Sequence, residues 1–268
     1  MIGQEKLLSI LDTYTLETLP KTLLFIGEEG SGRKTIITRL ANRLCLPVVM
    51  VDDNIDFETI LEYQRSVIKR MYCIDIDNFT EKMQNQFLKF IEEPAENVYI
   101  SIIAETENNV LETVLNRCIK FYIKPYSEVE LRQVRDYPDS LIYEICRTPG
   151  KIIAVDYRGI QDLYKFCTKL VQGVQKASYA NLLSVSAKIN YKEDWTKYDF
   201  YTFFDVLKKA SLDEFFKTNS PQAFTIYTLT TKYTNKFAVI KPLRENFVLS
   251  FLSNMWLETR KYHDVSTT

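Results

Sequence analysis

Short apolar runs alternate with stretches of helical periodicity over the first 124 residues of the chain. The runs TLLFIG, PVVMV, MYCIDI, VYISIIA and IKFYI are apolar almost throughout, which is typical of strands buried on both faces. Between them, residues 2–14, 35–44 and 57–69 place apolar side chains at helical spacing. The pattern predicts an α/β domain in which helices cover a parallel five-stranded sheet.

The pattern changes after KPYSEVEL, residues 124–131. Helical periodicity dominates from there, with one break at RTPGK (147–151) and long amphipathic stretches such as residues 198–217 and 243–262. We therefore predict three parts: an α/β core at residues 1–124, a small all-α domain at 125–156, and an all-α bundle at 157–268.

Composition narrows the class of protein. Of the 268 residues, 46% are apolar and 26% are charged, with a net charge of −1, the balance of a globular protein that does not bind nucleic acid by bulk charge. No apolar run approaches the roughly 20 residues of a membrane span, and no secretory leader is evident. We expect a cytoplasmic protein without a membrane partner.

Cysteine and histidine usage excludes several kinds of chemistry. The five cysteines are scattered without a C-x-x-C pair, which predicts free, mostly buried thiols and no zinc or other metal site. The single histidine, His263, lies near the end of the sequence. Histidine-based acid–base or nucleophilic catalysis is therefore not expected.

The segment GEEGSGRKT (27–35) follows the first predicted strand and precedes a predicted helix. This is the setting of a phosphate-binding loop, G-x-x-x-x-G-K-[ST], whose backbone N–H groups converge on phosphate oxygens. The second framework glycine is in register, but arginine fills the lysine position and lysine the Ser/Thr position. The loop predicts a degenerate site for ATP or ADP whose candidate contacts are Gly27, Gly30, Gly32, Arg33, Lys34 and Thr35.

Arginine does not replace lysine conservatively at such a position, because its planar fork is bulkier than an ammonium group. Successive helical residues turn by about 100°, so Lys34 and Thr35 point away from the phosphates unless the loop bulges by one residue. ATP hydrolysis is therefore not favoured. An active ATPase with a shifted lysine remains the alternative.

The strand-like segment MYCIDIDNF supports the same interpretation. Hydrolysing ATPases of this type end a strand with an Asp–Glu pair, one carboxylate supporting Mg²⁺ and the next activating water. Alignment on DNFT places Ile74 in the metal-supporting position and Asp75 in the water-activating one. In the alternative interpretation, Asp75 and Asp77 only cap the next helix.

Residues 80–94, TEKMQNQFLKFIEEP, follow this strand and closely resemble clamp-loader proteins of the AAA+ superfamily, above all the delta-prime subunits of bacterial DNA polymerase III. IGQEKLL (2–8), GEEGSGRKT, VLNRC (114–118) and TPGK (148–151) occur in the same order. The resemblance covers residues 1–156 well. The C-terminal bundle resembles the family weakly, through LRENFVLSFL (243–252).

The resemblance implies an AAA+ core, a helical lid and a helical collar that joins other clamp-loader subunits in a hetero-oligomeric ring. Such a ring opens a sliding clamp and places it on primed DNA. Delta-prime subunits are commonly non-hydrolysing and insert an arginine finger into a neighbour's ATP site from a Ser-Arg-Cys motif. Here that motif matches Asn116, Arg117 and Cys118, with the serine replaced. Thr106 falls near the position that senses γ-phosphate, and Lys151 near the basic residue of the lid.

The chain departs from the family in three respects. It lacks the four-cysteine zinc module that many delta-prime proteins carry, it is shorter than a typical member, and LPKT (19–22) lacks a histidine often found there. A structural protein that has diverged from replication but keeps the AAA+ fold is a third interpretation. The intact arginine of NRC favours the clamp-loader interpretation.

Two groups of basic residues are candidates for DNA contact. One group ends a predicted helix and the other lies along the helix after the loop, where either could follow a phosphate backbone or simply be a solvated helix face. Their members are Arg65, Lys69 and Arg70 in the first group, and Arg33, Lys34, Arg39 and Arg43 in the second.

Overall fold

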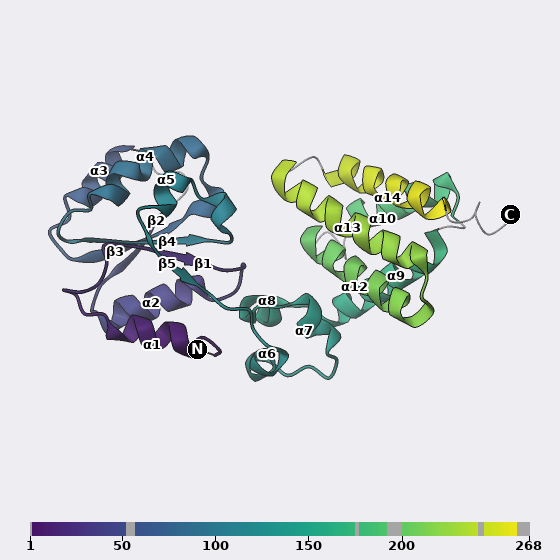
Figure 1. Cartoon of the computed structure of the whole chain (residues 1–268), viewed down its shortest axis with the longest axis horizontal. Coiled ribbons are helices and arrows are strands. Elements are labelled where there is room, and N and C mark those ends of the chain that lie inside the picture. The colour runs from purple at the N-terminus through teal and green to yellow at the C-terminus, as the bar shows by residue number, and fades with distance from the viewer. Residues whose placement is uncertain (1, 52–56, 175–176, 192–199, 241–243, 262–268) are drawn as a thin grey trace. The chain divides into compact units, whose positions relative to one another are not determined.

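A computed structural model describes residues 2–51, 57–174, 177–191, 200–240 and 244–261, and His263 lies outside these ranges. The chain forms two compact units, Met1–Ala154 and Val155–Thr268 (Figure 1). The lid predicted at 125–156 falls almost wholly within the first unit, so its status as a separate domain stays a prediction.

The first unit contains the predicted parallel sheet, with strand order β2-β3-β4-β1-β5. This confirms the α/β class. The strands are β1 (Thr22–Ile26), β2 (Val48–Val51), β3 (Arg70–Asp75), β4 (Val98–Ala104) and β5 (Ile119–Tyr122). The helices are α1 (Glu5–Thr13), α2 (Arg33–Arg43), α3 (Phe57–Gln64), α4 (Glu81–Glu92), α5 (Glu112–Leu115), α6 (Glu128–Val134), α7 (Leu141–Ile145) and α8 (Pro149–Ala154), with 3-10 turns η1 (Ile76–Asn78) and η2 (Glu107–Asn109).

The register of the strands determines where the polar segments meet. β1 lies between β4 and β5, and β3 pairs with β4 so that Asp75 lies opposite Ile103. Because all strands run parallel, the segments that follow β1, β3 and β4 leave the sheet at the same edge. The glycine-rich loop, the two aspartates after β3 and the residues after β4 are therefore brought together.

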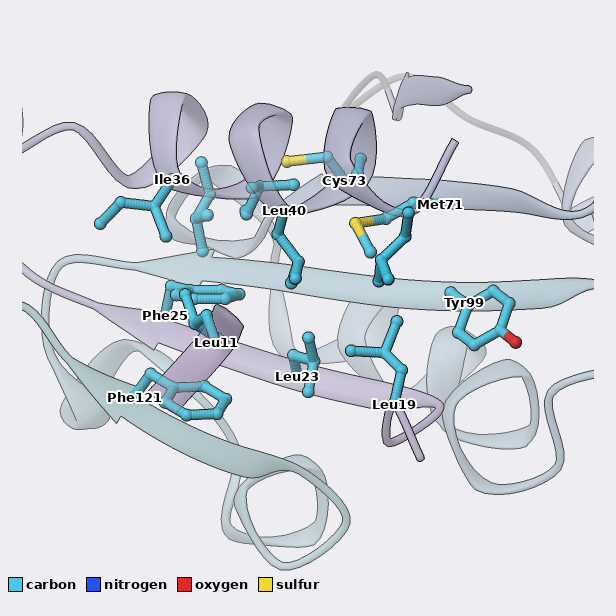
Figure 2. Close-up of a cluster of buried hydrophobic side chains, with 14 of the residues drawn as sticks. Leu11, Leu19, Leu23, Phe25, Ile36, Leu40, Met71, Cys73, Tyr99 and Phe121 are labelled. Atoms are coloured by element: carbon cyan, nitrogen blue, oxygen red, sulfur yellow. The ribbon is translucent and has the colours of Figure 1, made fainter. Parts of the chain in front are cut away.

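Side chains of β3 alternate between two cores. Met71 and Cys73 belong to the cluster under α1 and α2, which Figure 2 shows, whereas Tyr72 and Ile74 belong to the cluster under α4 and α5. Each fully buried large apolar side chain contributes about 1.5–3 kcal/mol. Burial on both faces explains why the strands are apolar without interruption.

The helical segment after β5 begins with a capping box. The Ser127 hydroxyl accepts a hydrogen bond from the Glu130 N–H, and the Glu130 carboxylate accepts one from the Ser127 N–H at 2.7 Å. This bond and the Lys124 ammonium, 2.9 Å away, lower the pKa of Glu130 to about 2. The start of α6 is thereby fixed close to the predicted boundary at residue 125.

The second unit is all-α, as predicted. Its described helices are α9 (Tyr157–Gly173), α10 (Tyr179–Tyr191), α12 (Phe200–Thr218), α13 (Pro221–Ile240) and α14 (Arg244–Arg260). Aromatic rings fill its core, with Phe251 5.0 Å from Phe204 and 5.2 Å from Tyr233 between ring centroids. Within the described ranges, no helix combines the length and apolarity needed to cross a membrane.

Two predictions about individual residues have different outcomes. All five cysteines are free, and three of them are buried, as predicted. The helix expected over residues 57–69 ends at Gln64 instead. The Asn97 side chain binds the carbonyls of Ser66 and Val67 and fixes a non-helical turn there. The first group of basic residues therefore lies beyond α3 rather than along it.

Candidate functional site

The glycine-rich loop has the backbone of an anion-binding site. Gly30 and Gly32 adopt φ values of 76° and 92°, a left-handed conformation that favours glycine. Gly32 is the N-cap of α2, and no side chain caps the helix there. Gly27 continues β1 by donating to the Ala104 carbonyl. The N–H groups of the first turn of α2 are thus suited to bind an anion.

Arg33, in the lysine position, is turned toward the protein interior. Its side chain is only 9% exposed, and its Nη1 donates to Oδ2 of Asp77 at 3.0 Å. The same carboxylate accepts the Glu105 N–H at 2.9 Å and the Asn109 side-chain amide at 2.7 Å. Asp77 therefore ties α2 to the end of β4, and the charge of Arg33 is neutralised within the chain.

Lys34 and Thr35 lie on the exposed side of the first turn of α2. The Lys34 ammonium is 3.3 Å from Oδ2 of Asp75, and its side chain is 58% exposed, which makes this a surface ion pair of small energetic weight. Asp75 is two residues after Cys73 and so continues the α2 face of β3. Ile74, in the metal-supporting position, is buried in the core of the opposite face.

The alternative interpretation of the two aspartates as helix caps is wrong. Asp75 precedes η1 but makes no side-chain cap bond, and α4 is capped by the Thr80 hydroxyl, which accepts the Met83 N–H at 3.3 Å. The aspartates instead bind the cations at the start of α2, because parallel strands end at the edge where that helix begins.

Glu105 joins this group of charges. Burial raises the pKa of Glu105, the Asp77 carboxylate raises it further, and Arg33 and Lys151 act in the opposite direction. Lys151 on α8 is thus electrostatically coupled to the end of β4. Thr106 is exposed beside Glu105, and its side chain does not cap η2.

Residues 148–150, part of the predicted lid, form hydrogen bonds to the loop. The Thr148 hydroxyl donates to the Glu29 carbonyl at 2.9 Å, and the Gly150 N–H donates to the Gly30 carbonyl at 2.8 Å. A Cβ atom on Gly150 would lie 2.7 Å from the Gly30 Cα. The Tyr126 hydroxyl donates to the Ser31 carbonyl at 2.7 Å. Three consecutive residues of the loop, 29–31, are therefore held by residues that follow β5.

This close approach leads to a prediction for Gly150→Ala. The added methyl group would force the lid segment away from Gly30, and we expect a loss of about 1–3 kcal/mol in the free energy of unfolding. Urea denaturation measures the change. Gly173→Ala is the matched control, because no atom lies within 4 Å of its added Cβ; alanine there should be neutral or slightly stabilising. Equal effects of the two substitutions would contradict the close contact.

A cavity of about 180 Å³ lies beside the loop. Its lining includes Glu28, Lys124 and Arg147, together with the buried Ser31 hydroxyl, which has no hydrogen-bond partner among the described residues. Pockets for whole ligands span about 300–1,000 Å³. This cavity is therefore large enough for a small polar group but not for an entire nucleotide.

The residues at this edge combine backbone donors suited to a phosphate with cations that already have carboxylate partners. The loop amides suit an anion, but Arg33 and Lys34 are both paired with carboxylates of this chain, and Ile74 is apolar and buried. Across the described ranges, no three His, Cys, Asp or Glu side chains are grouped so as to hold a metal ion.

Arg117 lies on a different surface, between α5 and β5. Its Nε donates to Oε1 of Glu92 at 2.5 Å, its Nη2 also contacts Glu92, and its Nη1 donates to the Thr113 carbonyl at 2.5 Å. The side chain is 35% exposed. The neighbouring Cys118 thiol donates to the Val114 carbonyl, and burial raises the pKa of this thiol to about 12. The turn that carries Arg117 is thus firmly held and its thiol is unreactive.

Two residues that support the segment around Arg117 were not predicted from the sequence: Gln84, and Glu92, the partner of Arg117 described above. The Gln84 side chain is buried, donates to the Asn109 carbonyl and accepts the Leu111 N–H, both at 2.9 Å. It thereby fixes the segment leading to α5. Its signal in the sequence is a polar residue in register with the apolar positions Phe87 and Ile91 of α4.

The basic residues farther along α2 are also paired. Arg39 contacts Asp12 at 2.8 Å, and Arg43 contacts Asp12 at 3.5 Å while donating to the carbonyls of Leu11 and Tyr14. These contacts dock α2 on α1. They favour a structural role for this group of basic residues over contact with a DNA backbone.

The fold is similar to those of two proteins of Thermotoga maritima. The DNA polymerase III gamma subunit-related protein of Thermotoga maritima aligns with 96% of this chain and 98% of its own, at 16% identity and a TM-score of 0.50. The Holliday junction branch migration motor RuvB of T. maritima aligns with 76% of this chain and 87% of its own, at 14% identity and a TM-score of 0.50. At such identities the likeness shows the fold alone.

The family is indicated by the sequence. Residues 58–127 match the family model described as DNA polymerase III, delta subunit, and they include the segment 80–94 that carried the resemblance. No curated protein matches the chain. The match is limited to this segment, and together with the fold it supports the resemblance to DNA polymerase III clamp-loader subunits.

Proposed function

We propose that the chain is a non-hydrolysing clamp-loader subunit that donates Arg117 to the ATP site of a neighbouring subunit. One observation carries this proposal. The Arg33 guanidinium of the chain's own phosphate loop is buried and paired with Asp77, whereas the Arg117 guanidinium, paired with Glu92, is partly exposed at the surface. A cation at an exposed, firmly held position is available to a partner.

The proposed role of Arg117 follows from phosphoryl-transfer chemistry. A guanidinium that approaches a γ-phosphate stabilises the charge that develops on its oxygens in the transition state. The paired N–H groups of arginine match phosphate oxygens in a bidentate manner that lysine cannot reproduce. The partners are accordingly other loader subunits in a ring, and through them the sliding clamp and primed DNA.

In this proposal the chain's own phosphate loop stays bonded to residues 148–150 and holds no nucleotide. Binding of ATP or ADP would require Thr148 and Gly150 to separate from the carbonyls of Glu29 and Gly30. Thr106 and Lys151, near the family's sensing positions, would then face the ligand. The hydrogen bonds between loop and lid favour the closed state without nucleotide.

A second candidate function is an active ATPase with a shifted lysine. The contact between Lys34 and Asp75 favours it, because the shifted lysine lies 3.3 Å from the carboxylate in the water-activating position. In that case Lys34 would bind the phosphates, Thr35 would support Mg²⁺, and Asp75 would assist the metal or the attacking water.

ATP turnover by the isolated chain distinguishes the two candidates. We expect the purified protein with Mg²⁺ and ATP to release no phosphate above the level of its Lys34→Ala variant, because Arg33 is buried in its ion pair with Asp77 and Lys34 lies one position past the usual lysine. A sensitive phosphate-release assay measures this. Turnover that depends on Mg²⁺ and is lost in Lys34→Ala would instead establish the shifted-lysine ATPase.

A further inference from the structure

We propose that Glu92 is a positioning residue, which holds the Arg117 guanidinium with its phosphate-binding edge directed outward. This inference rests on the proposed function, because it assigns to Glu92 a role in the action of the finger. The two residues are 25 positions apart in sequence, and they come from the end of α4 and the turn after α5.

The hydrogen bonds define which edge of the guanidinium remains available. An arginine side chain has five N–H donors in a fixed plane. Glu92 accepts from Nε and contacts Nη2 along the side edge, and the Thr113 carbonyl accepts from Nη1. One N–H on each terminal nitrogen remains for another acceptor. Because Glu92 occupies the side edge, phosphate oxygens are left to approach the guanidinium from the terminal nitrogens.

Stability does not account for this pair. The side chains of Arg117 and Glu92 are 35% and 41% exposed, and ion pairs in such positions contribute little to stability. Glu92 is also the last residue of α4, where the helix dipole disfavours a carboxylate. A carboxylate that gains little stability and opposes the helix dipole is better explained by its effect on Arg117.

Rigid elements support both contacts. Phe87, Phe90 and Ile91 of α4 are buried against the sheet, so Glu92 is carried by a well-packed helix. Thr113 lies on α5, whose leading segment is fixed by the Gln84 hydrogen bonds. A free arginine side chain loses rotamer entropy when it binds. Ordering the guanidinium beforehand reduces that cost when the neighbour's phosphate arrives.

The test uses the clamp loader reconstituted from this chain and the loader subunits of the same organism, with Glu92→Ala, Glu92→Gln, Arg117→Ala and the double alanine variant. We expect Glu92→Ala to lower kcat for ATP about tenfold without changing KM or assembly. Glu92→Gln should retain most of the activity, because its Oε1 can still accept both donors. The double variant should be no slower than Arg117→Ala. Glu93→Ala, exposed at the adjacent position, is the matched control and should match the unmodified chain.

The outcomes separate this inference from the proposed function. If Arg117→Ala slows the loader but Glu92→Ala does not, the positioning role is overturned and the finger stands. If the losses from Glu92→Ala and Arg117→Ala add in the double variant, Glu92 acts independently of Arg117 and the inference is likewise overturned. If Arg117→Ala has no effect, the finger itself is refuted, and the role of Glu92 with it.

Discussion

Replacement of Arg117 by alanine is expected to slow ATP hydrolysis at the neighbouring site of the assembled loader by about 100-fold or more. Arginine fingers supplied in trans accelerate phosphoryl transfer by about 10³–10⁵-fold. Other cations at the neighbouring site keep part of this acceleration, so the loss on removing Arg117 is expected to be smaller than the full range. Single-turnover hydrolysis by the reconstituted ring measures the effect directly.

The fold should survive this substitution. Arg117 is 35% exposed and its ion pair with Glu92 lies at the surface, so we expect a change of less than about 1 kcal/mol in the free energy of unfolding. Arg117→Lys keeps the charge but loses the planar fork, and it should recover only part of the rate. Lys82→Ala, which removes an exposed lysine of α4, is the control for a general loss of positive charge. An unchanged rate in Arg117→Ala would exclude the finger.

The fold was largely predictable because it depends on local patterning. The five strands, α2 and the long helices α9, α12 and α14 follow from apolar runs and helical spacing in single segments. The exception, the early end of α3, depends on Asn97, which lies about 30 residues away and binds the turn through its side-chain amide. A window of sequence contains no trace of such a distant partner.

The candidate site was predictable in its parts but not in its contacts. The motifs identified Arg33, Lys34, Asp75 and Arg117 individually. Which carboxylate each cation binds depends on the register of β3 against β4 and on the start of α2 at Gly32. The pairing of Arg33 with Asp77 therefore emerges only when three separate segments meet at one edge of the sheet.

Replacement of Asp77 by alanine is expected to lower the free energy of unfolding by about 3 kcal/mol. The substitution leaves the Arg33 guanidinium, only 9% exposed, without its counter-ion, and breaking one side of a buried pair costs about 3–5 kcal/mol. The Glu105 N–H and the Asn109 amide also lose their acceptor. Urea denaturation followed by circular dichroism measures the loss.

Asp75→Ala is the matched control. It removes the other carboxylate after β3, whose partner Lys34 is 58% exposed. We expect it to cost less than about 1 kcal/mol. Arg33→Met should restore part of the stability in the Asp77→Ala background, because it removes the unpaired charge while keeping an apolar stem. Equal losses for the two aspartate variants would show that Arg33 is no more committed to the fold than Lys34. A large difference, with rescue by Arg33→Met, would mean that Arg33 is committed to holding α2 against the ends of β3 and β4. An arginine held in that way is not available as the phosphate ligand of an active ATPase.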